Sequence, residues 1–259
     1  MTLGLDMAVF ERLRMRGPGD IESAAICLRD VAMGMCRVRV AATHNIASSR
    51  PMVDGEGRVL AATVFGFDDL DQAWWLAPNL AFSSPLAALC RLELDPFWCN
   101  AAGVWTDRGQ CAMLPVDLSD FERRAMTRSA LVVPVHMPLG QVGAVSFLPV
   151  DTSSENLSEM FAAYADVLGI YARRFIGSYA RLLHASVSLH LTPNLTRREV
   201  ECLRWASRGK TNEEIALILE VTRSTVRFHI RNASEKLDAV NRDQTVYKAA
   251  QLGYLALSP

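Results

Sequence analysis

Four helix starts recur in the last quarter of the chain, and this repetition constrains the fold more than any other feature. Thr196 and Thr211 are each followed three positions later by a glutamate. This is the spacing of a capping box, in which hydroxyl and carboxylate accept hydrogen bonds from the free amides of a helix start. Thr222 and Asn241 are suited to cap two more helices, and apolar residues follow each start at helical spacing. Gly209 stands where a left-handed cap would end the first helix. The pattern predicts a bundle of four helices.

The second and third of these helices have the spacing of a helix–turn–helix. Ala216 is small enough to let the next helix approach, and Val226, ten residues on, is expected to be the buried residue of that crossing helix. In such a motif the second helix places its N-terminal half in the major groove of DNA. A row of basic residues on a helix can also be merely a solvated face. Within a helix–turn–helix a DNA contact is favoured, because arginine is suited to hydrogen bonds with guanine and phosphate. The predicted recognition residues are Arg223, Ser224, Thr225, Arg227 and Arg231.

This segment resembles the LuxR-type helix–turn–helix over residues 195–252. The resemblance is carried by LTRRE, EIA, TVRFHI, KL and NR-x-Q. The amino-acid sequence of the segment is similar to the quorum-sensing branch of the family in particular. The resemblance implies a transcription regulator that binds double-stranded DNA. It also implies base contacts from Arg227 and Arg231, and backbone contacts around Thr211, Thr225 and Lys236.

Charge is unevenly distributed along the chain, although the net charge is only −1. Residues 191–259 carry 11 Lys and Arg against 8 Asp and Glu, whereas residues 1–190 carry 16 against 20. The basic surplus therefore lies where phosphate contacts are expected. Because this surplus is modest, we predict that two copies bind a two-fold symmetric operator as a homodimer. RNA polymerase is a further candidate partner.

Several absences narrow the function. The three lysines, Lys210, Lys236 and Lys248, all lie in the helical segment, so residues 1–190 lack the lysine of a phosphorylated receiver domain and that of a P-loop. There is no GxSxG or other catalytic constellation, and we predict no enzyme activity. The six cysteines show no CxxC and no metal-ligand spacing, which predicts reduced thiols, no metal and no cofactor. Without a secretion signal or a membrane-spanning apolar run, the chain is expected to be cytoplasmic and to have no membrane partner.

The chain length and the mixed pattern of the first part predict two domains. Residues 1–183 are expected to form the first domain, 184–190 the linker and 191–259 the DNA-binding domain. The predicted fold class is α+β. An N-terminal α-β-α sandwich around an antiparallel sheet is joined to an all-α, four-helix, helix–turn–helix domain.

Individual elements of the first domain follow from periodicity. Pro134 is awkward inside a strand and predicts an edge or a bulge. Thr152, with Glu155 three residues on, predicts the start of a long helix ending near Leu183. The other expected elements are a helix over 21–35, strands over 37–43 and 58–65, and a hairpin of 130–136 and 141–148 around a turn at 138–140.

Aromatic residues gather between positions 65 and 105, where four of the five tryptophans lie. Such rings either line a small-molecule pocket or fill a core, and both interpretations stay open. This half resembles the autoinducer-binding domain of LuxR-type regulators through the aromatic pair at 74–75, SSPL, PFWC and VPVHMPLGQVGAVSF. The resemblance implies a ligand pocket here, and His136 on the hairpin is polar and suited to orient a ligand. The predicted ligand-binding residues are Trp74, Trp75, Phe82, Ser84, Phe97, Trp98, Trp105 and His136.

Ser84 departs from the pattern of that family. The family has an Asp-Pro pair whose carboxylate holds the amide N–H of the signal, whereas this chain has Ser84-Pro85. A charge-assisted hydrogen bond is about twice as strong as a neutral one, so Ser84 argues against an acyl-homoserine lactone. Members of this kind are called LuxR solos. Two hypotheses remain: a regulator controlled by another small hydrophobic or amphipathic signal, and a ligand-independent regulator whose first domain serves dimerisation or protein interaction.

Overall fold

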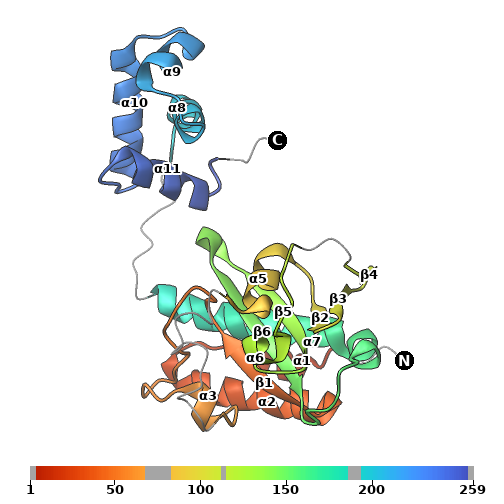
Figure 1. Cartoon of the computed structure of the whole chain (residues 1–259). Helices are drawn as coiled ribbons and strands as arrows, with labels where there is room; N and C mark the ends of the chain where they lie inside the picture. The colour runs from red at the N-terminus through yellow and green to blue at the C-terminus, as the bar shows by residue number, and fades with distance from the viewer. Residues whose placement is uncertain (1–3, 68–82, 112–114, 186–193, 256–259) are drawn as a thin grey trace. The chain divides into compact units, whose positions relative to one another are not determined.

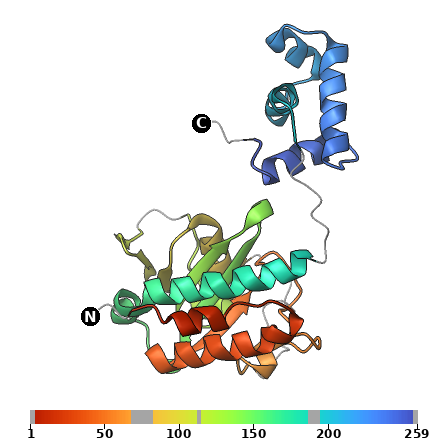
Figure 2. The same ribbon diagram turned by 180° about the vertical axis from the view of Figure 1, so that it is seen from behind.

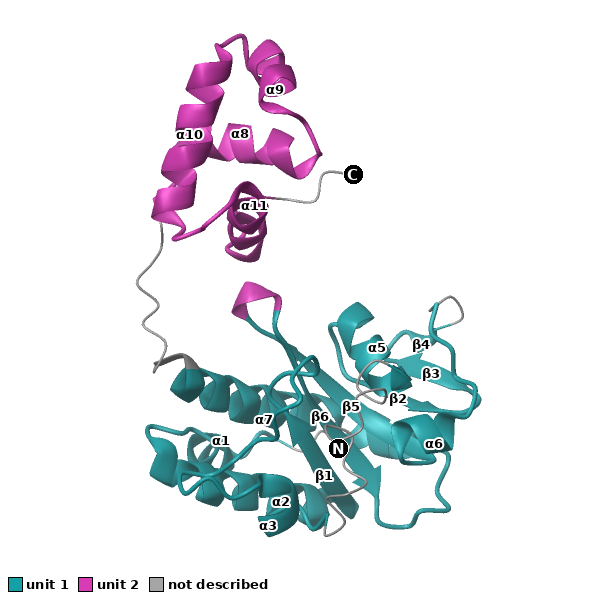
Figure 3. Ribbon diagram, turned by 60° about the vertical axis from the view of Figure 1, so that its left-hand side comes forward, with its two compact units in different colours: residues 1–137, 141–188 teal, residues 138–140, 189–259 magenta. Residues whose placement is uncertain are grey.

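The chain forms two compact units, which are described separately (Figure 3). The first comprises residues 1–137 and 141–188, and the second comprises 138–140 and 189–259. The structure is a computed structural model, and the residues that it describes are 4–67, 83–111, 115–185 and 194–255.

A six-stranded sheet forms the centre of the first unit. Its strand order is β1-β6-β5-β2-β3-β4, and every neighbouring pair is antiparallel. The predicted hairpin is confirmed, because β5 and β6 are joined by the short turn η3 (Pro138–Gly140). The strands are β1 (Val38–Thr43), β2 (Phe97–Asn100), β3 (Gly103–Thr106), β4 (Gly109–Gln110), β5 (Ser129–His136) and β6 (Val142–Pro149).

Helices cover both faces of this sheet, which confirms the α-β-α sandwich (Figures 1 and 2). The long helix α7 (Ser158–Ala185) and α2 (Ile21–Cys36) pack on one face, and α1 (Met7–Arg12) lies against α2. On the other face are α5 (Pro85–Leu92) and α6 (Phe121–Ala125). Each face therefore has its own buried apolar cluster. The short helices η1 (Pro18–Asp20) and α3 (Leu60–Thr63) complete the described elements of the unit.

Two expectations for the first unit were wrong. The predicted strand over 58–65 is only an isolated bridge, Val53 with Val59, followed by the helical turn α3. Alternation was a weak guide there, because Leu60 turns inward and its amide bonds to the Met52 carbonyl. The long helix begins at Ser158, six residues after the expected cap at Thr152. The amide of Ser158 donates to the Asn156 side chain at 2.9 Å instead.

Pro134 lies in β5, a strand in the middle of the sheet rather than at its margin. However, β5 pairs with β2 only over Ser129–Val132, whereas it pairs with β6 up to His136. At Pro134 the strand therefore has no partner on its β2 side. A proline is tolerated there because it cannot donate to a ladder that has already ended. The interpretation as an edge is thus confirmed locally.

The second unit is helical and confirms the predicted bundle. The side chains of Thr196, Thr211, Thr222 and Asn241 each accept a hydrogen bond from the amide three residues on. Gly209 has a φ of +79°, as the predicted left-handed helix end requires. The helices are α8 (Arg197–Ser207), α9 (Asn212–Leu219), α10 (Arg223–Lys236) and α11 (Arg242–Gln251).

Candidate nucleic-acid interface and ligand cavity

Helix α10 is fixed by its inner face and by its N-terminal cap. Val226 is completely buried and Ile230 nearly so, packed with Ile215 and Ala216 of α9. This is the helix–turn–helix contact expected from the small residue in the first helix and the buried residue in the second. The fixed inner face determines which side chains of α10 point outward.

The outward face carries the predicted arginines. Arg227 and Arg231 are exposed, one helical turn apart, and Phe228 beside them is 59% exposed. The Arg231 guanidinium lies 2.9 Å from the Glu235 carboxylate, and both side chains are exposed. Such surface pairs contribute only about 0–1 kcal/mol, so the arginine is free to exchange this partner for DNA. Arg227 has no ion pair with any described residue. Sequence reasoning did not include Phe228, although its spacing places it on this face.

Three other predicted contacts lie at the start of α10. Arg223 pairs with Glu213 of α9 at 2.9 Å, with both side chains exposed. Ser224 is exposed, and its hydroxyl and that of Thr225 lie 2.7 and 2.8 Å from the Thr222 hydroxyl. Thr211, the cap of α9, is also exposed. The structure therefore places these residues at or near the N-terminal ends of α9 and α10. Their contacts with DNA stay a prediction.

Lys236 has a different environment from the arginines. Its ammonium donates to both carboxylate oxygens of Glu199, at 2.9 and 2.8 Å, and to the Asn194 carbonyl at 3.1 Å. Burial alone would raise the pKa of Glu199, but hydrogen bonds from Lys236 and from the Thr196 amide outweigh it and lower that pKa. The three donors of the ammonium are thus used inside the unit. Lys236 neutralises a buried carboxylate, and a further role in DNA contact stays a prediction.

We expect Thr222→Ala to destabilise the helix that carries the arginines. The Thr222 hydroxyl accepts the Thr225 amide at 3.2 Å, and loss of such a cap costs about 0.5–2 kcal/mol. Denaturant unfolding of the full chain, followed by the helical signal, measures this loss. Thr222→Ser keeps the acceptor and should unfold like the wild type. Equal stability of all three proteins would contradict the capping role.

A cavity of about 300 Å³ lies between α5 and the β1–β6 end of the sheet. It exists because the side chains on this face are small. Ala41 faces Ser146 across the two strands, and Thr43 faces Ala144. The opposite face of the same strands carries large buried residues such as Val40 and Phe147. Phe65, Phe67, Leu86 and Cys90 provide apolar walls. The polar side chains among the described lining residues are Arg39, Thr43, Ser84, Arg124 and Ser146.

The polar side chains of the cavity differ in how many hydrogen bonds they make within the protein. Arg124 is fully engaged, because its guanidinium bonds to the Ser83 carbonyl at 2.8 Å and to the Asp117 carboxylate at 2.7 Å. The Thr43 hydroxyl donates to the Asn45 carbonyl. In contrast, the hydroxyls of Ser84 and Ser146 make no hydrogen bond to described residues. The sequence analysis identified Ser84 but not Ser146. Ser146 stands among apolar residues in the sequence of the second hairpin strand, where a single serine gives no signal of its own.

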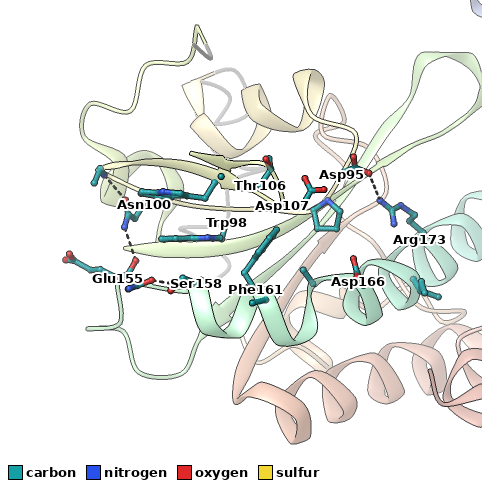
Figure 4. Close-up of a pocket in the computed structure, with 18 residues that line it drawn as sticks. Asp95, Trp98, Asn100, Thr106, Asp107, Glu155, Ser158, Phe161, Asp166 and Arg173 are labelled. Atoms are coloured by element: carbon teal, nitrogen blue, oxygen red, sulfur yellow. Dashed lines mark hydrogen bonds and ion pairs between the residues drawn. The ribbon is translucent and has the colours of Figure 1, made fainter. Parts of the chain in front are cut away.

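A second hollow, an open groove of about 1210 Å³, lies on the other face of the sheet between β2, β3 and α7 (Figure 4). Trp98 and Trp105 face each other across β2 and β3, and their rings stack at 4.0 Å between centroids with 9° between planes. Phe161 of α7 lines the groove as well, and Asp107 and Asp166 add negative charge to it. Among the described lining residues Arg173 is the single cation, 4.0 Å from Asp95.

The structure does not bring the predicted ligand residues into one site. Ser84 lines the cavity, whereas Trp98 and Trp105 line the groove on the opposite face. Phe97 neighbours Trp98 in β2 and therefore points the other way, into the apolar cluster under α5. The ring of His136 is exposed and lies 2.9 Å from the Glu93 carbonyl. Trp74, Trp75 and Phe82 lie outside the described residues, and the assignment of all eight stays a prediction.

The thiols of Cys90, which lines the cavity, and of Cys99 in β2 are buried, which disfavours the reactive thiolate form. Burial raises the pKa of Cys90 to about 12 and that of Cys99 well above its ordinary value. All six cysteines are free. Within the described ranges no cluster of three His, Cys, Asp or Glu side chains is arranged to hold a metal ion. Nor does any helix in those ranges have the length and apolar character needed to cross a membrane.

A helix–turn–helix unit with exposed arginines, joined to an α/β unit with a cavity on one face of its sheet, is the architecture of a DNA-binding transcription regulator. The family model described as bacterial regulatory proteins, luxR family, matches residues 193–249. The quorum sensing-dependent transcriptional regulator RpaR of Rhodopseudomonas palustris is 35% identical over 187 residues, which cover 71% of this chain and 70% of RpaR. The chain belongs to the LuxR family.

Two further comparisons extend this result. The transcriptional activator protein VanR of Vibrio anguillarum is 35% identical over 128 residues, which cover 49% of this chain and 52% of VanR. The chain thus spans about half the length of that relative. The crystal structure of Escherichia coli SdiA aligns with 97% of this chain and 97% of its own, with a TM-score of 0.50 and 20% identity. This likeness supports the α/β fold of the first unit beside the helical unit.

Proposed function

We propose that this chain is a cytoplasmic homodimer that binds a two-fold symmetric operator and is controlled by a small hydrophobic or amphipathic molecule. The molecule binds in the cavity between α5 and the β1–β6 end of the sheet. The observation that carries the proposal is this hollow itself, because it is lined by small and apolar side chains and by unused hydroxyls. Its task is binding and regulation rather than catalysis.

The DNA-binding half of the proposal is supported by the arrangement of α10. The exposed face of this helix presents Arg227 and Arg231. Arg231 has one surface ion pair, with Glu235, and Arg227 has none with a described residue. Arginine is the residue best suited to bidentate contact with guanine. A homodimer doubles these contacts, which compensates for the modest basic surplus of a single copy. RNA polymerase is the partner through which such a regulator would act on transcription.

The ligand-binding half is supported by the difference between the two hollows. The cavity is apolar and close to the lower end of the 300–1,000 Å³ range typical of small-molecule sites. The groove beside Trp98 is larger, more open and lined by several carboxylates. A bound apolar molecule would remain more exposed to water there and would gain less free energy from burial. We therefore place the signal in the cavity. Ser84 offers a neutral hydroxyl at its edge in place of a carboxylate.

Ala144→Leu tests the cavity as the site. The added carbons project into the hollow, so the variant should remain folded and lose the small molecule that co-purifies with the wild type from its native host. Mass spectrometry of the extracted proteins measures this loss. Thermal unfolding should show it too, because a ligand held at a hundredfold its Kd stabilises by about 2.7 kcal/mol.

Ala165→Leu is the matched control, because Ala165 lines the groove on the opposite face and is 6% exposed, against 7% for Ala144. This variant should keep the co-purifying molecule. If Ala144→Leu carries the same molecule as the wild type, the cavity is not the site. If no molecule accompanies any of the three proteins, the first unit is better described as a dimerisation or protein-interaction module.

A further inference from the structure

One charged side chain lies on the cavity face of β1. Along this strand Arg39, Ala41 and Thr43 all line the cavity, and Arg39 faces Leu148 of β6. The strand alternation that makes the cavity hollow thus also directs a guanidinium to its wall. Arg39 is half-buried, so water solvates part of its charge, and the part that faces the hollow can gain from an acceptor bound there.

The contacts of Arg39 with described residues do not include a carboxylate. Its Nη2 donates to the Gly66 carbonyl at 2.8 Å, and its guanidinium carbon lies 4.3 Å above the centre of the Phe67 ring. No carboxylate of a described residue lies within ion-pair distance of it. Arginine has five N–H donors, so several remain for another acceptor. The carbonyl and the ring hold the guanidinium in place without neutralising it.

Arg124, the other arginine of the cavity, shows the contrast. It bonds to the Asp117 carboxylate at 2.7 Å and to the Ser83 and Ser119 carbonyls at 2.8 and 2.9 Å. Its charge is therefore neutralised inside the protein, and its position is fixed. Among the described residues of the cavity wall, Arg39 is the cation that lacks a carboxylate.

We infer that the cavity takes a compact amphipathic carboxylate, whose anionic head pairs with Arg39 and whose apolar body lies against Phe65 and Leu86. The planar guanidinium matches a carboxylate in a bidentate pair, which is stronger than a neutral hydrogen bond. Ser146, opposite Ala41 in the strand register, offers a hydroxyl on the same wall. This inference rests on the proposed function, because it names the class of signal for that same cavity.

Titration calorimetry of the full chain tests the inference with matched pairs of probes. The probes are nonanoate and 4-phenylbutanoate, each compared with its own primary amide, which has the same body without the charge. The wild type should bind at least one acid ten times or more tightly than its amide. Arg39→Gln should lower the affinity for that acid to the level of the amide and leave the affinity for the amide unchanged.

Two further variants make the result specific. Arg91→Gln removes an exposed arginine of α5 outside the cavity wall and should keep the preference for the acid. Arg39→Lys keeps the charge without the planar fork, and should keep part of the preference. It also serves as the second test if Arg39→Gln does not fold.

The outcomes separate this inference from the proposed function. Equal binding of acid and amide by the wild type, or an unchanged preference in Arg39→Gln, overturns the role of Arg39 and leaves the cavity as a ligand site. Absence of binding by both acids overturns the inference as well. The proposed function is then decided independently by the molecule that co-purifies with the wild type and with Ala144→Leu.

Discussion

The double variant Arg227→Ala/Arg231→Ala is expected to lose sequence-specific DNA binding and to keep the stability of the wild-type chain. Both side chains are exposed, and the buried residues that hold α10 in place, Val226 and Ile230, are unchanged. A bidentate contact with a base discriminates by about 1–3 kcal/mol, which is roughly a five- to 150-fold change in affinity. Each single variant should lose about this much at each half-site of the operator. Because a symmetric dimer would lose each contact twice, the double variant should fall to the level of non-specific binding.

Gel-shift titration at one fixed salt concentration measures this effect. The duplex is first selected from a random pool with the wild-type protein, so that its sequence need not be known beforehand. Arg204→Ala is the matched control, because Arg204 is an exposed arginine of α8 without an ion pair to any described residue. It should keep discrimination between the selected and a scrambled duplex. Retention of wild-type affinity by the double variant would contradict the assignment of α10 as the recognition helix.

The helical unit could be predicted almost completely from the sequence because its signals are local. A capping residue and its amide partner are three positions apart, so the bond between Thr196 and Glu199 is visible in the printed sequence. The hairpin of β5 and β6 was likewise predictable from two apolar runs around the Pro-Leu-Gly turn. In both cases the partners are close neighbours along the chain, and few alternatives compete.

The candidate ligand site was harder to predict, because it depends on which face of the sheet is hollow. Phe97 and Trp98 are neighbours in an aromatic cluster, but the strand sends them to opposite faces. Small residues such as Ala41 and Ala144, rather than the aromatic rings, make the cavity. They leave no strong signal in the sequence, because alanine in a strand is not conspicuous. The register of β1 with β6, which is non-local, is what brings them together.

Arg39 illustrates the same limit. The alternation of the segment 37–43 was visible and correctly predicted a strand, confirmed as β1. The sequence did not show that the arginine would line a hollow under a helix, since an arginine in an alternating strand is ordinarily on the solvent side. Only the position of α5 over this face decides the matter.

Lys236 is the clearest case of a residue whose role can be recognised only from the three-dimensional structure. The lysine lies 37 positions from Glu199 in the sequence, and their ion pair, with 2.8 Å between Nζ and Oε2, joins the end of α10 to the start of α8. The resemblance to the family implied a contact between this lysine and the DNA backbone. The structure uses its charge inside the unit, where the Glu199 side chain is only 3% exposed.

We expect Lys236→Met to destabilise the helical unit more than Glu199→Gln does. Removing the lysine leaves a buried carboxylate without its cation, and breaking such a pair costs roughly 3–5 kcal/mol when both partners are buried. Because the Lys236 side chain is 36% exposed, water compensates part of this loss, and about 2–4 kcal/mol is the expected cost. Glu199→Gln leaves a lysine that water can solvate and an amide oxygen that can still accept the Thr196 amide, so its cost should be smaller.

Denaturant unfolding of the wild type, both single variants and the Glu199→Gln/Lys236→Met double variant forms a cycle that measures the coupling between the two side chains. The double variant should be more stable than Lys236→Met alone, because it no longer buries an unpaired charge.

The pH dependence of the free energy of unfolding gives a second readout. Since the pKa of Glu199 is lowered in the folded chain, its contribution to stability is present above the ordinary glutamate pKa and is lost as the pH falls through the folded value. The gap between wild type and Lys236→Met should therefore narrow in acid. A Lys236→Met protein that unfolds like the wild type but binds all DNA sequences more weakly would instead show that the lysine acts on the phosphate backbone.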